Sequence, residues 1–177
     1  MRGDTTMSEK NHNIDYNAAS DMYRPEQIKK LIVVEAPPPS RKKYIYISSP
    51  LKNFEDIEDD TSLPATIFYH YFSKVPRNDQ EYREMLERLQ KMKIFIVDMY
   101  PEPIQVRNNK RNKEIIKQAI PSLKTRLQES RDIDTDKIDE IIFLMPRSGY
   151  TRIIRKHFHN AHVIRWKKFR MTREEAS

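Results

Sequence analysis

The chain has 177 residues, 37% of them hydrophobic and 10% aromatic, which is enough apolar material for one domain with a substantial core. It contains no cysteine, which excludes disulfides, thiol nucleophiles and iron–sulfur clusters. The formal net charge of +7 favours a polyanionic partner, and no apolar run is long enough for a membrane span or a signal peptide. We therefore expect an intracellular protein without membrane association or cofactor, whose partner is a polyanion such as nucleic acid.

The predicted organisation is one domain between two tails. Residues 1–23 are polar, rich in Asn, Asp and Ser, and lack helical or strand periodicity, which predicts a disordered tail. Residues 24–173 form the predicted domain, and residues 174–177 a short C-terminal tail.

The first predicted strand, residues 31–34, is an apolar run without a polar face, as is typical of a central strand in a parallel sheet. It ends at Glu35, and Ala36 and Pro37 begin a stiff segment with two further prolines. This pattern predicts a carboxylate at the carboxyl end of a strand, where open α/β sheets bind ligands. The alternative interpretation is an ordinary Pro-rich turn with a solvated Glu.

A basic and aromatic segment follows the prolines. Arg41, Lys42 and Lys43 precede Tyr44 and Tyr46, which would share one face of an extended segment. This arrangement favours a stacking platform for bases beside positive charge. The alternative is a surface turn whose tyrosines pack on the core.

The next segment repeats the design of the first strand. Residues 63–74 and 78–92 have helical patterns, and Asn78 with Glu81 forms a capping pair at the start of the second helix. Residues 93–97 then read as a strand that ends at Asp98, before another proline-stiffened turn. If the strands are parallel, the two strand-end acids lie at the same edge of the sheet.

The C-terminal half completes the predicted sheet. A basic stretch containing Arg107 leads into helices, and residues 141–145 form a third buried strand. The strand is followed by Arg147, Ser148 and Gly149, whose amides would form an anion site if a helix starts at residue 151. With a last strand at residues 161–166, we predict a three-layer α/β/α fold around a mainly parallel four-stranded sheet.

The segment from 146 to 173 carries Lys, Arg and aromatic residues but no acid, a composition suited to neutralising phosphates and stacking on bases. Because most basic clusters follow predicted strand ends, one parallel sheet would gather them at one rim; a solvated basic tail is the alternative. The predicted nucleic-acid-binding residues are Arg41, Lys42, Lys43, Arg107, Arg147, Ser148, Gly149, Arg165, Trp166, Lys167, Lys168, Phe169 and Arg170.

Two strand-end segments resemble the uracil-DNA glycosylase superfamily. Glu35-Ala36-Pro37 is similar to its first motif, GEAPG or GQDPYH, and the segment from Val97 to Pro101 is similar to its NYCP segment. The order and spacing of strands match over most of residues 29–170. The sequence departs from the family where Val34 replaces the first glycine, where Asp98 replaces the Asn, and where Arg165-Trp166-Lys167-Lys168-Phe169 replaces the HPSP-like last motif.

The resemblance implies hydrolysis of the N-glycosidic bond of a flipped, damaged or deaminated base. Glu35 and Asp98 would be the catalytic residues, with Glu35 holding water and Asp98 reading the base, while Ala36, Pro37, Tyr44 and Tyr46 would contact the base. Trp166 or Phe169 would wedge the duplex open. The rival interpretation is a nucleic-acid-binding protein that has kept the fold and lost the chemistry. A third, an enzyme of small nucleotides or phosphoesters, is weaker because no Gly-rich phosphate loop or metal-ligand cluster occurs.

Overall fold

The computed structural model describes residues 15–38, 44–47, 62–104, 109–145 and 149–171 of the chain. Its centre is a four-stranded sheet in the order β2-β1-β3-β4, and all three strand pairs are parallel. The predicted α/β class and four-stranded parallel sheet are confirmed. The strands are β1 (Lys30–Val34), β2 (Ile94–Asp98), β3 (Glu140–Met145) and β4 (His162–Arg165).

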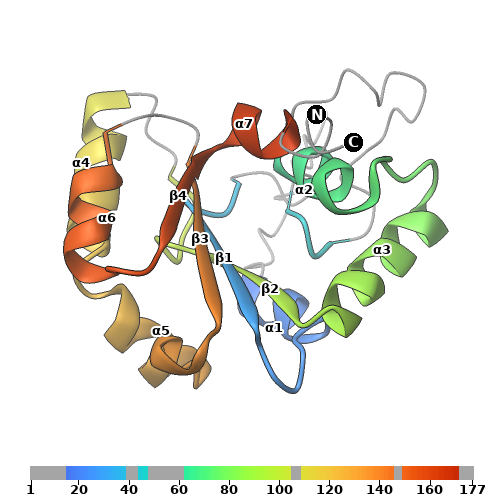
Figure 1. Ribbon diagram of the computed structural model, residues 1–177, viewed down its shortest axis with the longest axis horizontal. Coiled ribbons are helices and arrows are strands. Elements are labelled where there is room, and N and C mark those ends of the chain that lie inside the picture. The colour runs from blue at the N-terminus through green and yellow to red at the C-terminus, as the bar shows by residue number, and fades with distance from the viewer. Residues whose placement is uncertain (1–14, 39–43, 48–61, 105–108, 146–148, 172–177) are drawn as a thin grey trace, which may run out of the picture.

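Helices cover both faces of this sheet (Figure 1). Helices α4, α5 and α6 lie on one side and α2 and α3 on the other, as right-handed crossovers between parallel strands require. The helices are α1 (Tyr16–Asp21), α2 (Leu63–Phe72), α3 (Asp79–Lys91), α4 (Asn109–Ala119), α5 (Leu123–Arg131), α6 (Thr151–His157) and α7 (Trp166–Met171), with a short 3-10 helix, η3, at Thr135–Lys137.

The central strand β1 explains why the sheet needs two helical layers. Leu31, Ile32 and Val33 have no exposed surface, because strands and helices surround them on every side. Val33 is aligned with Val97 of β2 and with Phe143 of β3, so the buried residues of three strands form continuous rows. The absence of a polar face in the sequence of β1 follows from this position.

The N-terminus of α3 has the predicted cap. The Asn78 side chain accepts a hydrogen bond from the Glu81 amide at 2.8 Å, and a Glu81 carboxylate oxygen accepts one from the Arg77 amide at 2.8 Å. The first bond satisfies an amide that the first helical turn leaves without an intrahelical partner, and the second holds the residue before the cap against the helix. Tyr82, one helical turn after Asn78, is fully buried, and its hydroxyl donates a hydrogen bond to the Ile45 carbonyl at 2.6 Å.

The structure differs from the sequence prediction at the N-terminal segment, where residues 15–23 were expected to belong to a disordered tail. Residues 16–21 form α1, and Asp15 caps it by accepting a hydrogen bond from the Ala18 amide at 2.9 Å. The helix is held by Arg131 at the end of α5, whose guanidinium donates to side-chain oxygens of Asn17, Ser20 and Asp21 at 2.7, 2.9 and 2.6 Å. Local periodicity could not reveal these distant partners.

The segment after β4 was predicted to bind nucleic acid, with a solvated basic tail as the alternative, and the sequence analysis assigned no helix to it. It forms α7, which packs on α2. The Phe169 ring is buried and stacks on His70 with 3.7 Å between ring centroids. This buried aromatic side chain helps to anchor a helix that is otherwise rich in Lys and Arg.

Replacing Arg131 with Met should release α1. The substitution removes three hydrogen bonds but keeps much of the apolar stem, so we expect a loss of about 1–3 kcal/mol in the free energy of unfolding and faster hydrogen exchange in α1. Urea unfolding and amide exchange would measure both. The control is Lys137→Met, which removes an ammonium that is 82% exposed and pairs with Asp134 on the surface; it should cost less than about 0.5 kcal/mol. Unchanged exchange in α1 of the Arg131 variant would contradict this view of the helix.

Candidate site at the carboxyl edge of the sheet

Glu35 and Asp98 lie at the ends of neighbouring parallel strands. Asp98, the last residue of β2, is aligned with Val34, and Glu35 directly follows. Hydrogen bonds continue beyond the strands, from the Met99 amide to the Val34 carbonyl at 2.7 Å and from the Tyr100 amide to the Glu35 carbonyl at 3.0 Å. The expectation that the two acids share an edge is confirmed. Because Asp98 is level with Val34, the alternation of side chains along a strand assigns it to the opposite sheet face from Glu35.

Asp98 occupies an unusual environment for a carboxylate. Burial raises the pKa of its side chain from 3.8 to about 7, although the nearby charges of Arg126 and Arg131 act in the opposite direction. Arg126 approaches the same strand end, where its Nη2 donates to the carbonyls of Asp98 and Met99 at 2.5 and 2.8 Å. A carboxyl group with a pKa near neutrality can serve as a proton donor or acceptor.

Tyr44 and Tyr46 lie in the core, where they are only 5% and 6% exposed. The Tyr46 hydroxyl accepts a hydrogen bond from the Ile96 amide at 2.8 Å, and the Tyr44 hydroxyl donates to the Tyr16 carbonyl at 3.2 Å. The rings of Tyr16 and Tyr44 meet edge to face at 4.7 Å. This arrangement corresponds to the alternative interpretation of core-packed tyrosines and differs from an exposed stacking platform, because the rings cover the open edge of β2.

The other predicted base-contacting residues lie just beyond β1. Pro37 is buried and Ala36 is half-buried. The neighbouring Pro38 carbonyl accepts a hydrogen bond from the Tyr16 hydroxyl at 2.9 Å. The Pro-rich segment after Glu35 is thus tied to α1, which helps to hold the strand end in one conformation.

The basic and aromatic residues from Arg165 to Arg170 divide into outward and inward positions. Arg165, Lys167 and Lys168 are exposed. Trp166 is half-buried, and its indole Nε1 donates to the Leu144 carbonyl at 3.1 Å, while Phe169 is buried against His70. Since both rings are engaged within the fold, neither projects as a wedge. Arg170 is half-buried, with its guanidinium carbon 4.9 Å from the centre of the Tyr69 ring.

The turn after β3 is described only from Gly149 onward. Gly149 is exposed and has a φ of 120°, and Lys113 of α4 lies against it. Of the predicted site residues, Arg41, Lys42, Lys43, Arg107, Arg147 and Ser148 lie outside the described part of the chain.

Sequence reasoning assigned no role to Arg126 or Tyr16, and it considered Lys113 only as part of the basic stretch 107–113 that was expected at the rim of the sheet. Lys113 ends a basic stretch that was noticeable in the sequence, so its composition was a usable signal. The sequence around Arg126 and Tyr16 carried no such signal, because these residues reach the strand ends only through the packing of α5 and α1.

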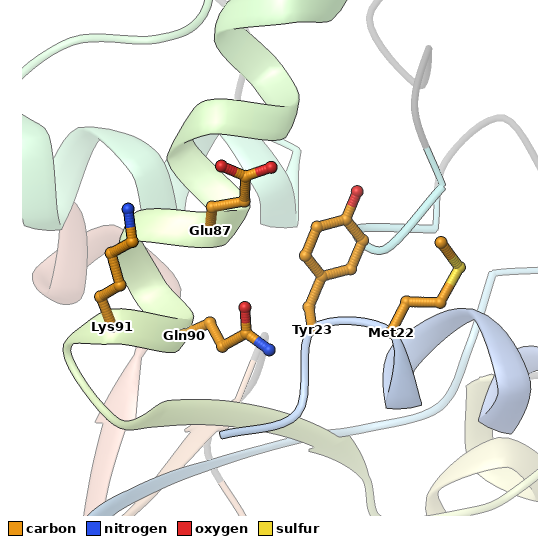
Figure 2. A pocket seen from close by; sticks show the side chains of 5 residues that line it. All are labelled: Met22, Tyr23, Glu87, Gln90 and Lys91. Atoms are coloured by element: carbon orange, nitrogen blue, oxygen red, sulfur yellow. The ribbon is translucent and has the colours of Figure 1, made fainter. Parts of the chain in front are cut away.

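Neither a metal site nor the pocket described below adds to the candidate site at the carboxyl edge. Within the described residues, no cluster of His, Asp or Glu could hold a metal ion. An open pocket of about 320 Å³ is lined by Met22, Tyr23, Glu87, Gln90 and Lys91 (Figure 2). Since the end of α3 leads directly into the start of β2, this pocket lies at the opposite end of that strand from Asp98.

Fold and site together define an α/β protein with an all-parallel four-stranded sheet and two strand-end acids at its carboxyl edge. No protein-family model matches the chain, and neither curated proteins nor solved structures gave a match. Among the helices that the structure describes, none has the length and apolar character needed to cross a membrane.

Replacing Asp98 with Asn should change how stability depends on pH. In the wild type the folded state holds the Asp98 proton up to a pKa of about 7, whereas the unfolded state releases it near 3.8. Stability should therefore fall as pH rises from about 4 to 7, by at most about 4 kcal/mol since one pKa unit corresponds to about 1.4 kcal/mol.

The amide side chain introduced by D98N does not ionise, so this variant should gain stability relative to the wild type over the same pH range. Urea unfolding at several pH values measures this difference, with Asp139→Asn as the control at an exposed position. Parallel curves for D98N and the wild type would contradict the prediction.

Proposed function

We propose that this protein binds nucleic acid, DNA in preference to RNA, along the carboxyl edge of its sheet and hydrolyses the N-glycosidic bond of a flipped, altered base. The observation that carries the proposal is the register of β1 and β2, which brings Glu35 and Asp98 to adjacent strand ends. The similarity of these two segments to motifs of the uracil-DNA glycosylase superfamily supports the same reaction class.

The distribution of charge supports nucleic acid as the partner. Among the described residues, every Lys or Arg that forms an ion pair with a described carboxylate lies between positions 29 and 137 of the sequence. Lys30, for example, pairs with Glu140 at 2.7 Å. By contrast, Arg165, Lys167 and Lys168 are exposed and form no ion pair with a described carboxylate. Exposed cations without internal partners are suited to replacing the counterions around phosphates.

The chemistry assigned to the edge is a displacement at the sugar. A water oxygen bonds to C1′, the C1′–N bond breaks, and its electron pair leaves with the base. The Glu35 carboxylate positions the water, accepts its proton and stabilises the positive charge that develops on the sugar. In this proposal Asp98 reads the base from the neighbouring strand end, and its raised pKa lets the protonated form donate a hydrogen bond near neutral pH while the ionised form accepts one.

A second candidate is a nucleic-acid-binding protein without catalysis. A specific observation favours it: the rings of Tyr44, Tyr46 and Phe169 are buried, and Trp166 is engaged with Leu144. Stacking on a flipped base or wedging a duplex requires rings that bases can reach. In this candidate Glu35 has no chemical role, and the exposed cations after β4 provide the binding.

The catalytic proposal predicts that Glu35→Gln abolishes base excision and leaves binding intact, because Gln cannot accept the proton of water. Labelled single- and double-stranded oligonucleotides carrying uracil, hypoxanthine, xanthine or hydroxymethyluracil would be incubated with the protein, and alkali would then cleave the abasic products. Glu102→Gln is the matched control, since Glu102 is an exposed acid just beyond β2; it should retain activity.

Abasic product with the wild type and E102Q, reduced about 100-fold or more in E35Q, would support the glycosylase. Retention of the oligonucleotides without product from any base would remove the catalytic proposal for those bases and favour the binding candidate.

The location of binding can be tested with two variants of equal charge. The triple variant R165Q/K167Q/K168Q neutralises three exposed cations at the end of β4 and in α7, and R152Q/R155Q/K156Q neutralises three on the exposed side of α6. If binding is at the carboxyl edge, the first variant should lower the slope of log affinity against log salt by up to about 2 for single strands, and the second should change it much less. Equal losses would show that net charge, and not this edge, governs affinity.

A further inference from the structure

The close approach of Lys113 to Gly149 is a feature that the proposed reaction does not explain. A Cβ atom at Gly149 would lie 2.6 Å from Nζ and 3.0 Å from Cε of Lys113. The φ of 120° at Gly149 is also a conformation that residues with a side chain rarely adopt. The backbone conformation therefore favours glycine here, and a side chain at this position would also displace the flexible end of Lys113.

Lys113 has no carboxylate partner among the described residues, unlike two other lysines in the segment between β2 and β3. On the same helix, Lys117 pairs with Glu114 at 3.3 Å, and on α5 Lys124 pairs with Asp136 at 2.6 Å. Lys113 is half-buried as a residue, and its ammonium lies beside Gly149. An ammonium in this position favours an external anion.

The position of Gly149 connects Lys113 with the candidate site. Val33 of β1 is aligned with Phe143 of β3, so the end of β3 at Met145 is level with Glu35. The turn that contains Gly149 follows β3 at this same carboxyl edge. The contact of Lys113 with Gly149 places α4 close to the start of α6, and Figure 1 shows these two helices on the same side of the sheet. Lys113 of α4 therefore lies toward the same carboxyl edge of the sheet at which β1 and β2 place Glu35 and Asp98.

We propose that Lys113 binds a backbone phosphate of the nucleic acid strand at the turn after β3. The proposal rests on the proposed function, and it adds a contact from α4 to those expected after β4. A lysine ammonium binds phosphate as a point charge and needs no fixed planar geometry. Gly149 contributes by leaving out a side chain, which lets both the ammonium and a strand come close to the backbone.

The test compares Lys113→Gln with Lys117→Gln, a variant of equal charge change one turn away on α4. Anisotropy of a labelled single-stranded oligonucleotide would be measured across a range of salt concentrations. K113Q should reduce the slope of log affinity against log salt by about 0.7 and lower the affinity about fivefold at 0.1 M salt. K117Q should bind like the wild type.

A second variant, Gly149→Ala, tests the geometry. Its methyl group would displace the Lys113 ammonium, so it should lose affinity like K113Q, and the double variant should lose no more than either single one. Thermal unfolding would identify G149A molecules that bind poorly only because they are unfolded. If G149A proves unfolded, the comparison of K113Q with K117Q decides alone.

The outcomes separate the two proposals. If the wild type binds and K113Q behaves like K117Q, the role of Lys113 is overturned and the proposed function stands. If the wild type does not retain the oligonucleotide at low salt, both are overturned. If a free nucleoside monophosphate displaces the oligonucleotide from the wild type but not from K113Q, the site takes free phosphoesters, and the assignment to a strand phosphate is overturned.

Discussion

The structure depends on the pairing of β1 with a parallel strand on each side. Since its residues are buried in every direction, β1 can exist only between two sheet neighbours and two helical layers. The same pairing determines where the strands end relative to one another. Val34 is level with Asp98, so the first polar residue after β1 and the last residue of β2 meet at one edge. The core and the candidate site thus have a common geometric cause.

The open edge of β2 links this framework to the chemistry of Asp98. An outer strand exposes amides that need partners, and the Tyr46 hydroxyl supplies one for Ile96. The tyrosines and α1 that cover this edge also bring apolar surface near the end of β2. Burial there raises the pKa of Asp98, while Arg126 and Arg131 limit the increase. Covering a sheet edge therefore also sets the protonation of a residue at the candidate site.

Helix α7 shows how burial directs charge outward. Phe169 packs on His70 and Trp166 bonds to the Leu144 carbonyl, so the aromatic side of the helix faces the protein. Lys167 and Lys168 are consequently exposed beside Arg165. In this arrangement the aromatic residues orient the cations, a structural role that differs from the wedging role that their composition suggested.

The sequence by itself determined the parts of the fold that depend on neighbouring residues. Apolar runs located β1, β2 and β3, and Asn78 with Glu81 located the start of α3, because burial of a strand and capping of a helix leave a local pattern. It also placed Glu35 and Asp98 at strand ends, and parallel pairing, which the sequence indicated, put them on one edge. Only the tertiary structure decided that Tyr44 and Tyr46 are buried, that Arg131 holds α1, and that Lys113 lies against Gly149. These features rest on contacts between residues far apart in the chain, and periodicity cannot specify such contacts.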